Sequence, residues 1–294
     1  MSNLGVRGCL RLPAYAKLNL SLLVGPKRAD GYHEISTVMV KISLCDWLEF
    51  SPAPAGVLEL SCSEPSLPLG HGNTVFKAAS LLMERYSPQL GARIHLEKGI
   101  PWGAGLGGGS SDAAVTFRAL NRLWNLRLSE EDLMRLGAEV GSDVPFFFSS
   151  SAAIATGRGE VLEPFEHGLG GYPLVVYPGV SVSTAWAYGA VTPRLTLDGA
   201  ITNIAALSCK RGDMSALANV ACNDFEPVVF NNHPLLREVV EGLRAKGAVF
   251  AGMSGSGSSL FGIFNREDER NEAYLWAQQR GFSVWAVEWV SDGV

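Results

Sequence analysis

The sequence has few cysteines and no long uncharged apolar run. Its five cysteines are scattered over 294 residues and include no C-x-x-C pair, which argues against a disulfide framework or a zinc site and favours reduced thiols. No stretch reaches the ~18 apolar residues of a membrane-spanning helix, and the N-terminus lacks the apolar core of a signal peptide. These absences predict a cytoplasmic protein with no membrane contact.

The sequence also has fewer basic than acidic residues. The chain has 24 basic and 29 acidic residues, a formal charge of −5. Proteins that bind nucleic acid usually carry a basic surface, so the charge balance predicts no nucleic acid partner. A small anionic substrate is still compatible with it, because local charge can oppose net charge. The sequence indicates no protein partner, and a monomer or a homodimer fits it equally.

The order of the expected elements indicates an α+β protein with two domains and helices packed on largely antiparallel sheets. Apolar and polar residues alternate over 10–24, which is typical of a strand. The apolar run after the G-S-D-V-P at 141–145 predicts another extended stretch, and a loop-like break at 163–172 predicts the domain boundary. Further strands are expected at 35–50, 57–61, 92–97, 173–177, 248–251, 260–264 and 283–288, and helices at 73–84, 111–124, from 129, 213–220, 234–246 and 267–280.

A glycine-rich run is the clearest local signal. Five of the seven residues from Gly103 to Gly109 are glycine, and a helix-like segment follows at Ser110-Ser111-Asp112. Glycine lets the backbone approach a ligand without a Cβ clash, and a helix N-terminus attracts anions. We therefore expect a phosphate-binding loop here rather than a flexible hinge.

Two better-known phosphate motifs do not fit this run. The spacing matches G-x-G-x-x-G, but it does not lie in a first strand–turn–helix unit with an acidic residue at a following strand end. A Walker A motif requires lysine where Gly109 stands. The positive charge and the reactive groups must therefore come from elsewhere in the chain.

Three other stretches offer such groups. Lys17 and Asn19 share one face of the first strand, Asp143 stands beside a strongly apolar run, and Met253–Ser259 is a second loop rich in glycine and serine. Taken alone, each stretch also has a purely structural interpretation. Lys17 could be a solvated strand lysine, Asp143 a turn aspartate, and the glycine- and serine-rich loop a tight turn.

Taken together and in this order, the stretches resemble the GHMP kinase superfamily. The matching segments cover nearly the whole chain, and they are A-Y-A-K-L-N-L-S-L (14–22), R-A-D-G-Y-H-E-I (28–35), G-A-G-L-G-G-G-S-S-D-A-A (103–114), G-S-D-V-P-F-F (141–147), P-G-V-S-V-S-T-A-W-A-Y (178–188) and M-S-G-S-G-S-S-L-F (253–261). The extra glycines and the D-G-Y-H stretch resemble the branch whose alcohol substrate carries a cytidine diphosphate group.

The resemblance implies a fold, a reaction and roles for individual residues. It implies an ATP-binding domain over 1–168, a ferredoxin-like substrate domain over 169–294, and ATP with Mg²⁺ as phosphoryl donor. Asp143 matches the catalytic base, Lys17 the lysine that supports it, and Asn19 a substrate-positioning amide. The residues matched to ATP binding are Pro101, Trp102, Gly103, Ala104, Gly105, Leu106, Gly107, Gly108, Gly109, Ser110, Ser111, Lys98 and Asn73, with Ser110 or Ser111 near the metal.

The cytidyl end of the substrate has its own matching residues. Tyr32 and Tyr188 match two aromatic positions that sandwich the cytosine, and a planar base stacks well between rings. His33 matches a group that bonds the base edge, and Thr184 lies near it in the motif. Trp102 stands where relatives carry a smaller apolar residue.

Two alternatives stay open on the sequence. Another GHMP small-molecule kinase, acting on mevalonate, a sugar or homoserine, would share ATP, Lys17 and Asp143. A non-catalytic nucleotide-binding protein on the same scaffold would be expected to lose that pair, and both residues are present.

Overall fold

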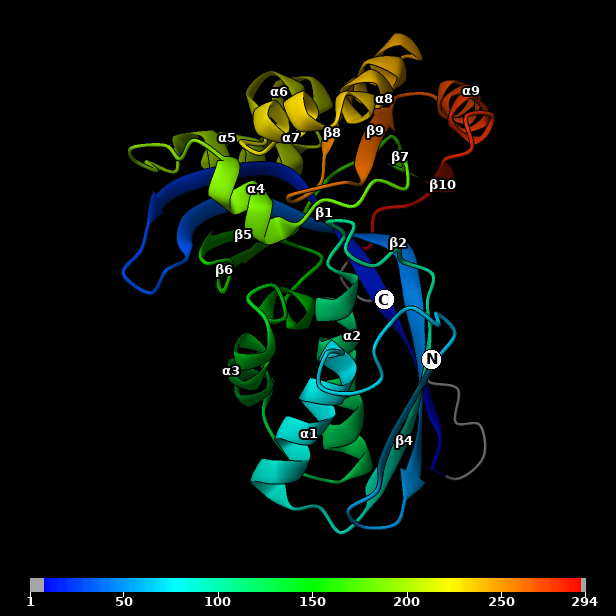
Figure 1. Cartoon of the computed structure of the whole chain (residues 1–294). Helices are drawn as coiled ribbons and strands as arrows, with labels where there is room; N and C mark the ends of the chain where they lie inside the picture. The colour runs from blue at the N-terminus through cyan, green and yellow to red at the C-terminus, as the bar shows by residue number, and fades with distance from the viewer. Residues whose placement is uncertain (1–7, 292–294) are drawn as a thin grey trace. The chain divides into compact units, whose positions relative to one another are not determined.

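The computed structural model describes residues 8–291 and consists of two compact units (Figure 1). The first unit takes Met1–Ala16, Cys45–Ile100 and Gly107–Phe148, and the second takes Lys17–Leu44, Pro101–Leu106 and Ser149–Val294. Two long strands, β1 (Leu10–Lys27) and β2 (His33–Ala53), contribute to both. The boundary between residues 168 and 169 stays a prediction, with residues 1–7 of its first segment outside the described part.

The first unit packs three helices beside a small group of strands. In it β4 (Gly91–Glu97) pairs antiparallel with the end of β2 and parallel with β3 (Leu58–Cys62). The helices α1 (Thr74–Tyr86), α2 (Gly108–Leu123) and α3 (Glu130–Val140) lie side by side (Figure 1). Alanines on α1 and α2 are fully buried, so these helices approach closely.

The helix starts follow from their capping residues. Asn73 caps α1 through its Oδ1, which accepts from the Val75 amide at 2.9 Å. Ser129 and Asp132 form a complete capping box at α3, although aspartate is shorter than the usual glutamate. The helix α2 begins three residues before the expected Ser111. Its N-cap is Gly107 in the left-handed region, so Gly108 and Gly109 already belong to the helix.

The extended stretch predicted after Asp143 is wrong. Pro145–Phe148 forms a short 3₁₀ helix, and all four of its side chains are buried. A strand would place alternate side chains on opposite faces, whereas this run buries every one. Arg118 of α2 donates to the Phe148 carbonyl at 3.0 Å and ends the turn, and the strand β5 begins only at Ala152.

The second unit contains an antiparallel sheet in the order β10-β7-β9-β8. The helices α8 (Pro234–Ala245) and α9 (Glu267–Gln278) pack against it, and β8 is an edge strand. The same unit pairs the start of β2 with β5 (Ala152–Gly157), which pairs with β6. The remaining elements are β6 (Val161–Phe165), β7 (Tyr172–Tyr177), β8 (Phe250–Met253), β9 (Leu260–Phe264), β10 (Ser283–Ala286), α4 (Thr184–Ala190), α5 (Ala200–Arg211), α6 (Met214–Val220) and α7 (Glu226–Asn232).

The α+β class and the antiparallel pairing are as expected, with β3–β4 the parallel exception. All five cysteines are free thiols, as their spacing predicted. No helix among residues 8–291 is long and apolar enough to cross a membrane. The predicted loop at 163–172 is wrong in its first residues, since β6 runs to Phe165.

Candidate active site

Two polar side chains of β1 meet inside the second unit. Strand alternation turns Lys17 and Asn19 to the same face, and both side chains are buried, with Lys17 only 3% exposed. The Lys17 ammonium donates to Asn19 Oδ1 and, at 2.7 Å, to the Gly105 carbonyl. Asn19 Nδ2 donates to Thr37 Oγ1 at 2.8 Å. Two oxygen acceptors, one on Asn19 and one on Gly105, therefore help to fix the buried ammonium.

The Gly/Ser loop, Ser254–Ser259, contacts the same carbonyl. Ser254 Oγ donates to the Gly105 carbonyl oxygen at 2.9 Å and accepts from the backbone N–H of Asn19 at 3.1 Å. A Cβ on Gly105 would lie 2.2 Å from the Ser254 carbonyl oxygen, so only glycine fits there. Three of the stretches singled out in the sequence thus meet at one point: the first strand, the glycine run and the Gly/Ser loop.

The glycine run itself is divided between the units. Pro101–Leu106 belongs to the second unit, and Gly107 with the start of α2 belongs to the first. The Trp102 ring is 55% exposed, and Gly103 has open space around it. The amides in the first turn of α2 have no helical partner, so they remain available to an anion.

Lys98 lies in a buried cluster of charges in the first unit. Its ammonium contacts Asp46 and, at 3.1 Å, Asp112 of α2. Asp46 Oδ1 also accepts from the amides of Gly99 and Ile100 at 2.7 and 2.8 Å. The cluster therefore ties the segment that precedes the glycine run to the helix that follows it.

This cluster contains two carboxyl groups for one cation. Burial raises the pKa of Asp112 well above its usual range, although the Lys98 ammonium opposes the shift. Burial disfavours the ammonium as well, but attraction to Asp112 and Asp46 outweighs it and raises the pKa of Lys98. Asp112 Oδ1 is buried and has no hydrogen-bond partner, so the cluster depends on its single cation.

The other residues matched to ATP or catalysis lie in the first unit. Asn73 is buried, and its side chain caps α1 while Nδ2 donates to the Pro68 carbonyl. Asp143 is half-buried in the loop between α3 and the 3₁₀ helix. A Cβ on Gly141 in that loop would lie 3.8 Å from Ser110 Oγ. The loop of Asp143 therefore lies beside the first turn of α2.

The residues matched to the cytidyl group lie in the second unit. The rings of His33 and Tyr188 stack with centroids 5.7 Å apart, and His33 Nδ1 lies 3.0 Å from the Gly25 carbonyl oxygen. Tyr32 is 53% exposed, and the Arg158 guanidinium lies 4.8 Å from its ring centroid. Thr184 Oγ1 bonds Ser256 Oγ of the Gly/Ser loop at 3.1 Å.

Several supporting residues carried no signal in the sequence. Asp46 is 52 positions from Lys98 along the chain, and Thr37 is one of several polar residues in β2. Asn223 donates to two carbonyls of the segment that ends in the Gly/Ser loop. None of these residues lies in a spacing that predicts chemistry, so only the fold identifies them.

Replacing Lys98 by methionine tests the charge cluster. Removing one partner of a buried ion pair lowers the free energy of unfolding by about 3–5 kcal/mol. In this variant Asp46 and Asp112 would stay buried with no cation beside them. Burial already raises the pKa of Asp112, and without Lys98 this carboxyl regains neutrality only by taking up a proton. The free energy of unfolding of K98M should fall below that of the wild type, by more at pH 8 than at pH 5, as measured by urea denaturation. A deficit that does not change with pH would contradict the assignment.

Comparison with known proteins gives matches in both halves of the chain. The model of the GHMP kinases N terminal domain matches residues 73–151, and that of the GHMP kinases C terminal domain matches 204–280. A 4-diphosphocytidyl-2-C-methyl-D-erythritol kinase of Chlorobium phaeobacteroides (strain BS1) is 43% identical over 90% of this chain and 92% of its own length. One from Prosthecochloris aestuarii is 42% identical over the same shares.

Solved structures give the same result. A crystal structure of 4-(cytidine 5'-diphospho)-2C-methyl-D-erythritol kinase superposes with a TM-score of 0.78 at 37% identity, covering 95% of this chain and 98% of the other. A homoserine kinase from Cytophaga hutchinsonii reaches a TM-score of 0.77 at 16% identity, covering 98% and 97%, which shows the shared fold alone. The two domain models and the relatives together show that the chain belongs to the GHMP kinase family.

Proposed function

We propose that the chain transfers the γ-phosphoryl group of ATP to the 2-hydroxyl of 4-diphosphocytidyl-2-C-methyl-D-erythritol, in non-mevalonate isoprenoid precursor synthesis. The observation that carries the proposal is the 43% identity, over nine-tenths of both chains, to a kinase named for that substrate. The meeting of Lys17, Gly105 and Ser254 supports it, because three kinase motifs converge there.

The step we propose needs one general base and an ATP whose phosphates are bound in a fixed position. Asp143 takes the proton of the substrate's 2-hydroxyl while the oxygen of that hydroxyl bonds to the γ-phosphorus of ATP. The bond from the γ-phosphorus to the bridging oxygen then breaks, and that oxygen leaves as part of ADP. Phosphoryl transfer asks the protein mainly for alignment and charge stabilisation. Lys17 supplies a fixed positive charge, and the glycine run with the first turn of α2 binds the ATP phosphates.

Magnesium fits the donors that are present. Within residues 8–291 no group of three or more histidine, cysteine, aspartate or glutamate side chains could hold a metal. Mg²⁺ in kinase sites takes most of its ligands from substrate phosphates and water, so one protein hydroxyl is a sufficient contribution. Ser110 is half-buried and Ser111 buried at the start of α2. We propose that one of them holds the ion, which neutralises phosphate charge when bound.

The cytidyl group fits the aromatic residues of the second unit. The exposed Tyr32 ring and the half-buried Tyr188 ring offer faces for stacking. Arg158 already lies against Tyr32, and Tyr188 packs edge-on against Phe225 at 4.8 Å. We propose that Tyr32 and Tyr188 stack on the cytosine while His33 bonds its edge. Thr184 and Asn19 would position the rest of the substrate.

An assay of acceptor preference tests the substrate. Purified protein with ATP and Mg²⁺ should release ADP with 4-diphosphocytidyl-2-C-methyl-D-erythritol, and not with mevalonate, galactose or homoserine. Release with one of the other acceptors would keep the phosphoryl transfer and overturn the substrate. Binding of ATP without turnover of any acceptor would favour the non-catalytic alternative.

Replacing Asp143 by asparagine tests the base. The amide keeps the shape of the side chain but cannot accept the hydroxyl proton, so kcat should fall by about 10²–10⁴-fold. The Kd for ATP, measured by calorimetry, should stay close to that of the wild type. Equal losses in kcat and in ATP affinity would indicate a structural role for Asp143 instead.

Two glycines of the run form a matched pair for the contact at Gly105. Both Gly103 and Gly105 have positive φ, so alanine at either position carries a similar backbone cost of about 1–2 kcal/mol. Only at Gly105 would the new Cβ also meet carbonyl oxygens, at 2.2 and 2.9 Å. G105A should therefore lose much more of both kcat and Tm than G103A. Equal effects would mean that the close approach does not matter.

A further inference from the structure

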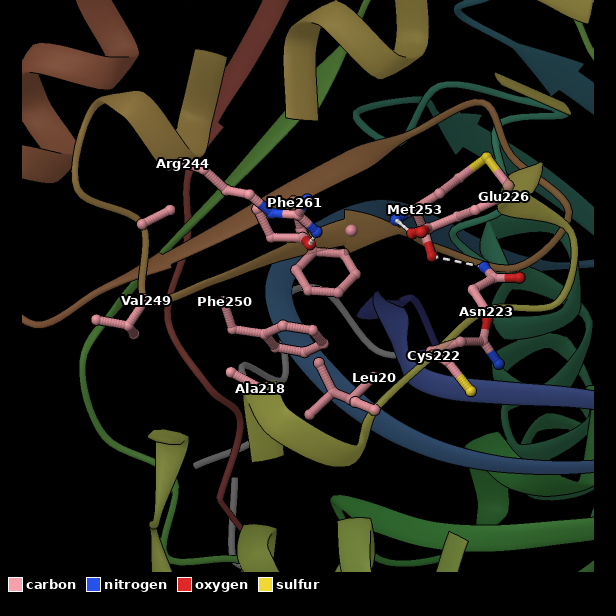
Figure 2. Close-up of a pocket in the computed structure, with 15 residues that line it drawn as sticks. Leu20, Ala218, Cys222, Asn223, Glu226, Arg244, Val249, Phe250, Met253 and Phe261 are labelled. Atoms are coloured by element: carbon pink, nitrogen blue, oxygen red, sulfur yellow. Dashed lines mark hydrogen bonds between the residues drawn. The ribbon is translucent and has the colours of Figure 1, made fainter. Parts of the chain in front are cut away.

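A cavity of about 360 Å³ lies along the outer edge of β8 in the second unit (Figure 2). Three polar side chains on its wall bind the main chain of that edge strand. Arg244 Nη2 donates to the Ala251 carbonyl at 2.9 Å, and Glu226 Oε1 accepts from the Met253 amide at 2.8 Å. Asn223 is the third, and it reaches furthest along the strand toward the Gly/Ser loop.

Asn223 fixes the main chain on both sides of Ser254. Its Nδ2 donates to the Met253 carbonyl and to the Gly255 carbonyl, each at 2.8 Å. Both amide hydrogens are therefore used, and the residue between the two carbonyls is Ser254. The Asn223 side chain is itself fixed, because Oδ1 accepts from the Phe225 amide at 3.0 Å and the residue is only 8% exposed.

The segment that carries Asn223 is also joined to β1. Leu22 donates its amide to the Cys222 carbonyl at 2.8 Å and accepts from the Asp224 amide at 3.0 Å. Asp224 Oδ2 in turn accepts from the Val24 amide at 2.9 Å. Asn223 is thus held against the strand that bears Lys17 and Asn19, and it holds the loop that bears Ser254.

Ser254 connects Asn223 to the Lys17 ammonium through the Gly105 carbonyl. Its Oγ contacts the Gly105 carbonyl and the Asn19 amide, and the Gly105 carbonyl accepts from the Lys17 ammonium. Two main-chain hydrogen bonds within the Gly/Ser loop order it in part, from Ser254 to the Ser259 carbonyl at 3.0 Å and from Gly257 to the Ser254 carbonyl at 3.1 Å. Gly255 and Gly257 have positive φ and no side chains to pack, and glycine is the residue with most freedom to lose on ordering.

We propose that Asn223 is a positioning residue for phosphoryl transfer, acting through Ser254 and Gly105 on the Lys17 ammonium. The role rests on the proposed function, because Lys17 matters to the reaction only if the chain is the kinase described above. Only asparagine offers two donors of this reach in a neutral side chain. Aspartate has the same shape and keeps the acceptor for Phe225, but as a carboxylate it cannot donate to either carbonyl.

The test compares N223A and N223D with R244M. Arg244 is the matched control, since it lines the same cavity and binds the same strand edge, but at Ala251 rather than beside Ser254. Misplacing a reacting group by about 1 Å can cost about 10²-fold in rate. Both Asn223 variants should therefore lose about that factor in kcat with little change in either KM, and R244M should keep most of its kcat.

Hydrogen exchange separates this role from a general loss of stability. Backbone amides of residues 253–259 and 101–106 should exchange faster in N223A and N223D than in R244M. Each variant is measured at the same number of degrees below its own Tm. If kcat falls equally in all three variants, or if both segments keep wild-type exchange, the positioning role is wrong. Wild-type protein that turns over no acceptor would instead overturn the proposed function, and the exchange data would still decide whether Asn223 orders the loop.

Discussion

The part of the candidate site in the second unit is built around one backbone carbonyl, that of Gly105. It accepts from the Lys17 ammonium at 2.7 Å and from the Ser254 hydroxyl at 2.9 Å, which uses both lone pairs of the oxygen. Lysine comes from a strand, serine from a distant loop, and the acceptor from the glycine run. Three segments that are far apart in the sequence are thereby fixed at one atom. The absence of a side chain at Gly105 is what allows the approach, because a Cβ would overlap the Ser254 carbonyl.

The first unit holds the other part of the glycine run by charge rather than by a shared neutral acceptor. Asp46 accepts from the two amides just before the run, and Lys98 links it to Asp112 in the helix just after. A buried ion cluster of this kind adds little net stability compared with apolar packing, but it fixes geometry because each partner is costly to leave unpaired. Burial keeps the pKa of Asp112 high, against the opposing effect of Lys98, so the cluster specifies position more than it stabilises the fold.

The sequence could predict the parts of the site that follow from local rules. Strand alternation places Lys17 and Asn19 on one face, and their side chains are indeed in contact. The helix expected from residue 73 is present, with Asn73 as its N-cap. Lys98 illustrates the limit, since its partner Asp46 is 52 positions away and no periodicity links them. The run at Pro145–Phe148 was misread for a similar reason. Burial on all sides has no period, and Arg118 from another helix ends the turn.

The residues that no motif predicted share a physical role. A loop built of glycine and serine can approach a ligand closely, but its side chains are small and ordering its glycines carries a large entropy cost. Part of its order comes from donors and acceptors on neighbouring segments, and Asn223 supplies two donors within the span of three residues. Such an anchor needs the right reach and hydrogen-bonding pattern, and it needs no reactivity. For that reason its importance becomes visible only when the loop and its neighbours are seen in the folded unit.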